Sequence, residues 1–171
     1  MRFIWIILFV SFGLKSSTNR FAEIEWKKDY KLSWKDFRKT NKKHHYDALS
    51  STGIAFSYVV GQKGVKVEAK AIFDRSESWV RKGRETESLL EHEQLHFDIA
   101  ELYTRKLREK IERDNITTAS GLDKVYNRIV IDLRKRQRMY DQQTDHGINK
   151  KEQMRWQEEI ANQLKIATAY S

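Results

Sequence analysis

Hydrophobic and polar positions alternate along two neighbouring stretches in the first half of the chain. An apolar side chain occupies every second position of both stretches, at Ile54, Phe56, Tyr58 and Val60, then at Val65, Val67, Ala69, Ala71 and Phe73. A period of two is typical of β-strands, and the segment between them, Gly61–Gly64, is short and begins and ends with glycine. The pattern therefore predicts an antiparallel β-hairpin.

Further along the chain, apolar residues recur every three to four positions, which is the spacing of one face of an α-helix. The first helical pattern runs from about Thr86 to Arg113. A second begins where Ser120 and Asp123 match a capping box. Gly147 ends it, and a third helix follows with Asn149 as its expected N-cap.

Each predicted helix carries a continuous apolar stripe that would face a core. The stripes are Leu89, Leu90, Leu95, Ile99, Ala100, Tyr103, Leu107 and Ile111, then Leu122, Val125, Tyr126, Ile129, Leu133 and Tyr140, then Trp156, Ile160 and Leu164. The order of elements predicts an α+β fold, with a small antiparallel sheet followed by three helices. We expect residues 18–171 to form one domain.

The N-terminus has the pattern of an export signal. Arg2 precedes an apolar run from Phe3 to Leu14, which is shorter than the 20 or so residues that span a membrane. We expect residues 1–17 to be a signal peptide and the protein to be exported, periplasmic or secreted, with no stable membrane span after processing. The alternative is an uncleaved N-terminal anchor.

The composition limits the possible metal ligands and partners of the protein. None of the 171 residues is cysteine, so disulfides are excluded and a metal must be bound by His, Asp or Glu. The formal charge of +9 suggests an anionic partner, and the basic run Arg134–Arg138 raises the question of nucleic acid. Export argues against nucleic acid, and loss of Arg2 and Lys15 lowers the charge from +9 to +7. We expect no nucleic-acid partner, and an anionic envelope surface is a candidate partner for the basic, aromatic stretch at residues 24–43.

The motif that carries chemistry is His92-Glu93-Gln94-Leu95-His96. Histidines four residues apart on a helix lie on one face, one turn apart, where both can bind a metal ion. Zinc accepts imidazole nitrogen readily and lowers the pKa of a bound water to about 7. Glu93 is placed to accept the proton of that water as a general base.

A third ligand must come from elsewhere in the chain. The extended pattern with a histidine at position 102 fails, because that residue is Leu102. His146 stands just past the second helix, which can return antiparallel to the motif helix, and Gly147 would allow a sharp turn after it. Asp141 and Asp145 are the alternative ligands. The pair His44-His45 lies in a basic polar stretch and is expected to be a solvated loop.

Two further residues are candidates for supporting roles. Tyr140 could donate a hydrogen bond to a developing oxyanion, or it could simply pack in the core. Asp98 could hold the second nitrogen of a metal-binding imidazole, or it could be a surface acid.

Several segments together resemble one bacterial family. They are Trp34–Phe37, Ser78–Val80, Leu89–Arg108 and Tyr140–Gly147, followed by Trp156. They look like domain of unknown function 922, a family described as predicted secreted zinc-dependent proteases, over roughly residues 26–164. The resemblance implies a zincin-like peptidase with a signal peptide. It also implies His92 and His96 as metal ligands, Glu93 as the base and His146 as the third ligand.

The sequence thus predicts an exported zinc-dependent metallopeptidase that acts on a peptide or protein substrate and uses Zn²⁺ as its cofactor. A peptide would bind as an added strand at a sheet edge, near Ala69–Phe73 or Trp79. The alternative function is a non-catalytic zinc-binding module associated with the envelope.

Overall fold

The computed structural model describes residues 23–42, 46–62 and 64–171. Its elements, in chain order, are β1 (Glu23–Glu25), the short 3₁₀ helix η1 (Trp34–Asp36), β2 (Arg38–Thr40), β3 (Ala48–Leu49), β4 (Thr52–Gly61), β5 (Gly64–Asp74), β6 (Trp79–Arg81), α1 (Glu87–Arg113), α2 (Ala119–Thr144), α3 (Lys150–Ile166) and the 3₁₀ helix η2 (Ala167–Tyr170). The expected signal peptide at residues 1–17 and the pair His44-His45 lie outside the described residues.

The strands form two small sheets, with orders β1-β5-β4 and β2-β6-β3. The expected hairpin is present, since β4 and β5 pair antiparallel from Thr52 opposite Phe73 to Gly61 opposite Gly64. Strand β3 pairs antiparallel with β6, whereas β2 pairs with β6 in parallel. The predicted α+β class, with a small antiparallel sheet followed by three helices, is confirmed. The structure adds a second small sheet, in which β2 and β6 are parallel.

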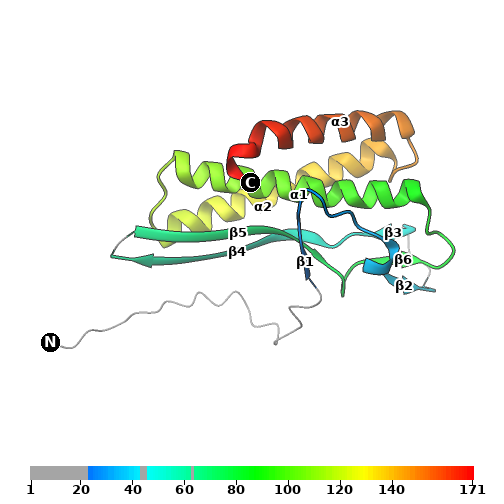
Figure 1. The fold of residues 1–171 in the computed structure, drawn as a ribbon, viewed down its shortest axis with the longest axis horizontal. Helices are drawn as coiled ribbons and strands as arrows, with labels where there is room; N and C mark the ends of the chain where they lie inside the picture. The colour runs from blue at the N-terminus through cyan, green and yellow to red at the C-terminus, as the bar shows by residue number, and fades with distance from the viewer. Residues whose placement is uncertain (1–22, 43–45, 63) are drawn as a thin grey trace.

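The three helices lie on one side of the β4–β5 hairpin (Figure 1). Helices α1 and α2 run antiparallel over the hairpin, and α3 packs on both of them on the side away from the sheet. Among the described residues, no helix combines the length and the apolar character needed to cross a bilayer.

The apolar stripes predicted from periodicity form the core. Leu107, Tyr140 and Trp156 of these stripes are fully buried, and so is Phe73 of the hairpin. Phe97 is also fully buried, although the predicted stripe of the first helix left it out. One face of β5 also packs inward, because buried residues alternate with partly exposed ones along its second half. Burial of this surface supplies the main driving force for folding, at about 25 cal/mol per Å² of apolar area.

The helix starts match the sequence at two of the three positions. Thr86 caps α1 by accepting a hydrogen bond from the Leu89 amide, and Asn149 caps α3 as expected. The expected capping box of α2 is wrong, because Thr118, two residues before Ser120, is the N-cap and α2 begins at Ala119. Asp123 instead accepts a hydrogen bond from the hydroxyl of Tyr58 at 2.8 Å, and so ties α2 to β4.

Both sheet edges expected for peptide binding are also wrong. The segment Ala69–Phe73 belongs to β5, which lies between β1 and β4, and Trp79 begins β6, which lies between β2 and β3. Strand β1 covers only the end of the first segment, but the carbonyl of Ala71 accepts a hydrogen bond from the Trp26 amide and that of Ala69 accepts one from the Arg108 side chain. Trp79 pairs with β2 on one side and with β3 on the other. Within the part of the chain that the structure describes, β3 is an edge strand, and it lies next to the motif helix.

Candidate metal centre

Three side chains of the His-Glu-x-x-His motif lie buried on one face of α1. His92, Glu93 and His96 are all less than 10% exposed, although each is charged or polar. They line a pocket of about 880 Å³. Strand β3 forms one wall of this pocket, and the end of α2 with the turn after it forms another. Helix α1 therefore presents the motif to a cavity that ligands can enter.

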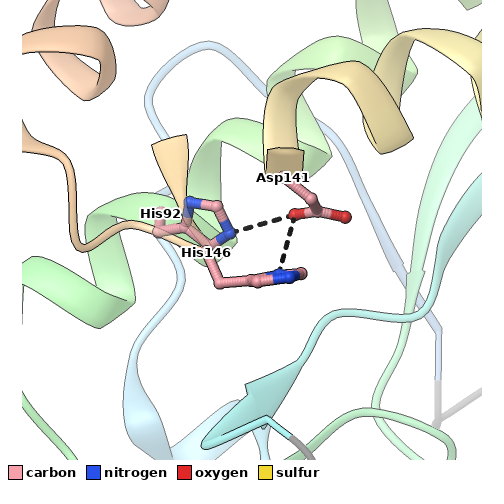
Figure 2. Close-up of side chains that lie close together, drawn as sticks. All are labelled: His92, Asp141 and His146. Carbon is pink, nitrogen blue, oxygen red and sulfur yellow. Dashed lines mark hydrogen bonds and ion pairs between the residues drawn. The ribbon is translucent and has the colours of Figure 1, made fainter. Parts of the chain in front are cut away.

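Asp141, near the end of α2, joins this face from the opposite helix. Its Oδ1 lies 2.9 Å from Nε2 of His96, 3.2 Å from Nε2 of His92 and 3.7 Å from Nδ1 of His146. Figure 2 shows the carboxylate of Asp141 between the rings of His92 and His146. Because α1 and α2 are antiparallel, residues far apart in the sequence meet here.

His146 reaches the site through a left-handed turn. Asp145, His146 and Gly147 have φ values of 48°, 51° and 84°, so three consecutive residues adopt positive φ. A non-glycine residue pays roughly 1–2 kcal/mol for this conformation. The strain is held by backbone hydrogen bonds, including those from the His146 amide to Asp141 and from the Asn149 amide to Thr144. The sharp turn expected at Gly147 is confirmed.

The group His92, Asp141 and His146 could hold a metal ion. One ligand atom from each lies within 4.8 Å of the others. His96 contacts the same oxygen of Asp141 and so lies beside this group. Of the predicted ligands His92, His96 and His146, this group contains His92 and His146 but not His96. It also contains Asp141, which the sequence offered only as an alternative to His146, whereas Asp145 is exposed.

The charges at the site stabilise one another. Burial acts to raise the pKa of Asp141, but its contacts with the imidazoles of His92 and His96 outweigh it and hold that pKa far below its usual value. Burial acts to lower the pKa of His96, but the hydrogen bond and negative charge of Asp141 outweigh it and raise that pKa. The carboxylate therefore stays ionised and favours a positive charge on the His96 imidazole.

The carboxylate of Glu93 is buried, and one of its oxygens has no hydrogen-bond partner among the described residues. Its side chain is 3% exposed and lines the pocket, yet its Oε2 has no hydrogen-bond partner in the described part of the chain. The backbone carbonyl of Glu93 accepts a hydrogen bond from Ser50 at 3.3 Å, which ties α1 to the segment following β3. An unpaired buried carboxylate oxygen costs stability, and such groups concentrate at functional sites.

Tyr140 lies behind His92. Its ring is fully buried and stacks on the His92 imidazole, with ring centroids 4.6 Å apart. The hydroxyl donates to Oε1 of Gln153 at 2.8 Å and lies 3.2 Å from the backbone oxygen of His92. Burial raises the pKa of the Tyr140 phenol well above its usual value. This position fits the expected core role, and among the described residues Tyr140 is not part of the pocket lining.

Asp98 does not support a histidine ligand, so that expectation is wrong. Its Oδ1 accepts hydrogen bonds from the indole of Trp26 at 2.8 Å and from the side chain of Gln94 at 3.0 Å. The residue that contacts the second nitrogen of a site histidine is Gln153 on α3, whose Oε1 lies 3.2 Å from Nδ1 of His92. Sequence reasoning missed it, because a glutamine in an amphipathic helix gives no signal of its own.

A sequence model of the family described as "Bacterial protein of unknown function (DUF922)" matches residues 28–147. This range holds the motif helix, Asp141 and the whole left-handed turn, and the chain therefore belongs to that family. No curated protein and no solved structure matches the chain.

Replacing Gly147 by alanine should disturb the site more than replacing Gly83. Both glycines have positive φ, but a Cβ at Gly147 would lie 3.0 Å from two atoms of His92, whereas a Cβ at Gly83 meets nothing within 4 Å. Gly83→Ala should cost about 1–2 kcal/mol in unfolding free energy. Gly147→Ala should cost more and shift the His92 ring signals in NMR spectra. Equal losses of stability with unchanged His92 signals would contradict the close packing of this turn.

The stability of the metal-free protein should be highest between about pH 4 and 6.5. Because folding raises the pKa of His96, its protonation stabilises the fold at pH values below its pKa in the unfolded chain. This stabilisation is lost as the pH rises through the pKa of the folded state. Because folding lowers the pKa of Asp141, its ionised form stabilises the fold at pH values above its pKa in the unfolded chain. This stabilisation is lost as the pH falls through the pKa of the folded state. Urea unfolding in EDTA measures the profile. Asp141→Asn should flatten the alkaline decline, and an unchanged slope would rule out this pair as its cause.

Proposed function

We propose that this member of the DUF922 family is an exported zinc-dependent metallopeptidase of the zincin type. The observation that carries the proposal is the Glu93 carboxylate. Glu93 is buried and lines the pocket, and its Oε2 has no hydrogen-bond partner among the described residues. It stands in the motif beside a His–Asp–His group suited to a metal ion. The apolar run of the N-terminal residues supports export.

The donor set fits zinc. Imidazole nitrogen and carboxylate oxygen are ligands that zinc accepts, and catalytic zinc sites typically have three protein ligands. His92, His96 and His146 can supply nitrogen, and Asp141 can supply oxygen or orient the histidines. A zinc ion bound there would act as a Lewis acid, polarising water and the substrate carbonyl.

Glu93 would move the proton. Its Oε2 would accept a proton from the attacking water and then deliver it to the leaving amine, so that a single carboxylate serves as base and acid. Because the Glu93 side chain is buried, its carboxylate has little freedom to move. The hydrogen bond from Ser50 to the Glu93 carbonyl fixes this turn of α1 relative to the adjacent strand.

Strand β3 offers the edge for a peptide substrate. Ala48 and Leu49 pair with β6 on one side and line the pocket on the other. An extended peptide could add to this edge through main-chain hydrogen bonds, which would place one of its carbonyl groups over the motif. Leu49 is partly exposed here and would contact the side chains of the peptide.

Asp141→Asn and His146→Asn should each weaken zinc binding by more than about tenfold, because each removes a group that converges on the site. Asp145→Asn is the matched control. It changes a neighbouring acid on the pocket rim, and asparagine tolerates positive φ. Competition with a chromophoric chelator measures the affinities. A loss confined to Asp145→Asn would overturn the ligand set.

Glu93→Gln should retain zinc but lose at least about 100-fold in peptide hydrolysis, because it removes the base and keeps the shape of the side chain. Glu91→Gln, an exposed acid two residues away, is the control and should remain active. Metal content and cleavage of a broad peptide library are the measurements.

Unchanged hydrolysis by Glu93→Gln would overturn the catalytic proposal. A wild-type protein that binds zinc but cleaves no member of the library would favour the non-catalytic, envelope-associated module instead. A protein that binds no zinc would exclude both functions.

A further inference from the structure

Gln153 is buried behind the metal centre, on the side of His92 away from the pocket. It lies on α3, outside the residues 28–147 that match the family, and its side chain is 3% exposed. Its Oε1 accepts a hydrogen bond from Tyr140 at 2.8 Å and lies 3.2 Å from Nδ1 of His92. The amide is therefore directed at the metal centre by its oxygen.

Donor and acceptor rules limit what this contact can be. An amide oxygen only accepts hydrogen bonds, so the contact with His92 is favourable when Nδ1 carries the proton. Nε2 of Gln153 has no hydrogen-bond partner among the described residues. The orientation of the amide thus follows from the two donors, Tyr140 and His92, that converge on its oxygen.

A second acceptor competes for the same imidazole. Oδ1 of Asp141 lies 3.2 Å from Nε2 of His92 and would favour the tautomer protonated at that nitrogen. His96, however, lies closer to this oxygen, at 2.9 Å, and can supply it with a donor. Only the tautomer with its proton on Nδ1 leaves the lone pair of Nε2 free for a metal ion.

We propose that Gln153 is a positioning residue that fixes His92 as the tautomer protonated at Nδ1, so that Nε2 is ready to bind a metal ion. The inference rests on the proposed zinc site. Tyr140 supports it by stacking on one side of the His92 ring and holding the Gln153 oxygen in place. The third helix thereby takes part in the metal centre without supplying a ligand.

The test compares Gln153→Met, Gln153→Glu and Gln157→Met. Methionine keeps the length of the side chain and removes the acceptor, whereas glutamate keeps an acceptor. Gln157 lies one turn further along α3 and lines a different pocket, so it controls for loss of a glutamine on this helix. Long-range ¹H–¹⁵N NMR spectra of the metal-free proteins at alkaline pH report the tautomer of His92.

We expect protonation at Nδ1 in the wild type, in Gln153→Glu and in Gln157→Met. In Gln153→Met it should move to Nε2, because Asp141 is then the acceptor that remains. Zinc affinity should fall about 10- to 100-fold in Gln153→Met and be retained in the other two variants. Circular dichroism checks that Gln153→Met is folded, and the tautomer of Gln153→Glu tests the proposal even if Gln153→Met fails to fold.

The two proposals fail in different ways. If the wild type binds no zinc, the proposed function fails, while the tautomer of His92 still tests Gln153 in the metal-free protein. If the wild type binds zinc but its metal-free His92 is protonated at Nε2, or the tautomer is the same in Gln153→Met, the role of Gln153 is overturned.

Discussion

Oδ1 of Asp141 is the atom at which three separate parts of the chain meet. From the end of α2 it contacts both histidines of α1 and faces His146 in the turn that leads to α3. These contacts depend on the antiparallel packing of α1 and α2 over the hairpin. Inserting one residue into α2 before Asp141 would rotate this carboxylate by about 100° around the helix axis and separate the three parts. The register of one helix pair therefore decides whether a site exists.

The net charge of the chain does not describe the charges that meet in the pocket. The sequence carries a formal net charge of +9, yet the pocket lining includes the carboxylates of Glu93 and Asp141. Basic side chains lie at the pocket rim, where Arg81 and Arg84 both pair with Asp47. Net charge thus describes the outer surface and the partners it would attract, and it says little about the chemistry of the centre.

Features with a periodic or local pattern in the sequence could be predicted. Helix α1 and the adjacent positions of His92 and His96 follow from spacing along a helix, and Asn149 was recognisable as a cap. The sequence left Asp141 and Asp145 as alternatives to His146, because residues four apart lie on the same face of a helix. Helix α2 ends at Thr144, so Asp145 already belongs to the left-handed turn and is exposed, and no pattern in the sequence predicted that end. Thr118 was missed because Ser120 offered a competing cap signal, and helix propensity did not distinguish the two.

The remaining errors concern contacts made over long distances in the sequence. Asp98 pairs with Trp26, which lies 72 residues away. Gln153 reaches His92 across 61 residues. Neither partnership leaves a pattern in the sequence, because each depends on how whole elements pack. The binding edge was assigned to the long strands that alternate clearly, whereas β3 has two residues and no detectable period.

The shortness of β3 has a consequence for the kinetics of any peptidase that uses it. Two residues of extended strand span about 7 Å, so the edge can grip the main chain of a peptide over little more than one dipeptide. So few main-chain contacts would provide little binding energy to the substrate in its ground state. Uncleaved substrates would therefore dissociate quickly. Discrimination between substrates would then rest on the side chains beside the scissile bond and be visible in kcat/KM more than in ground-state affinity.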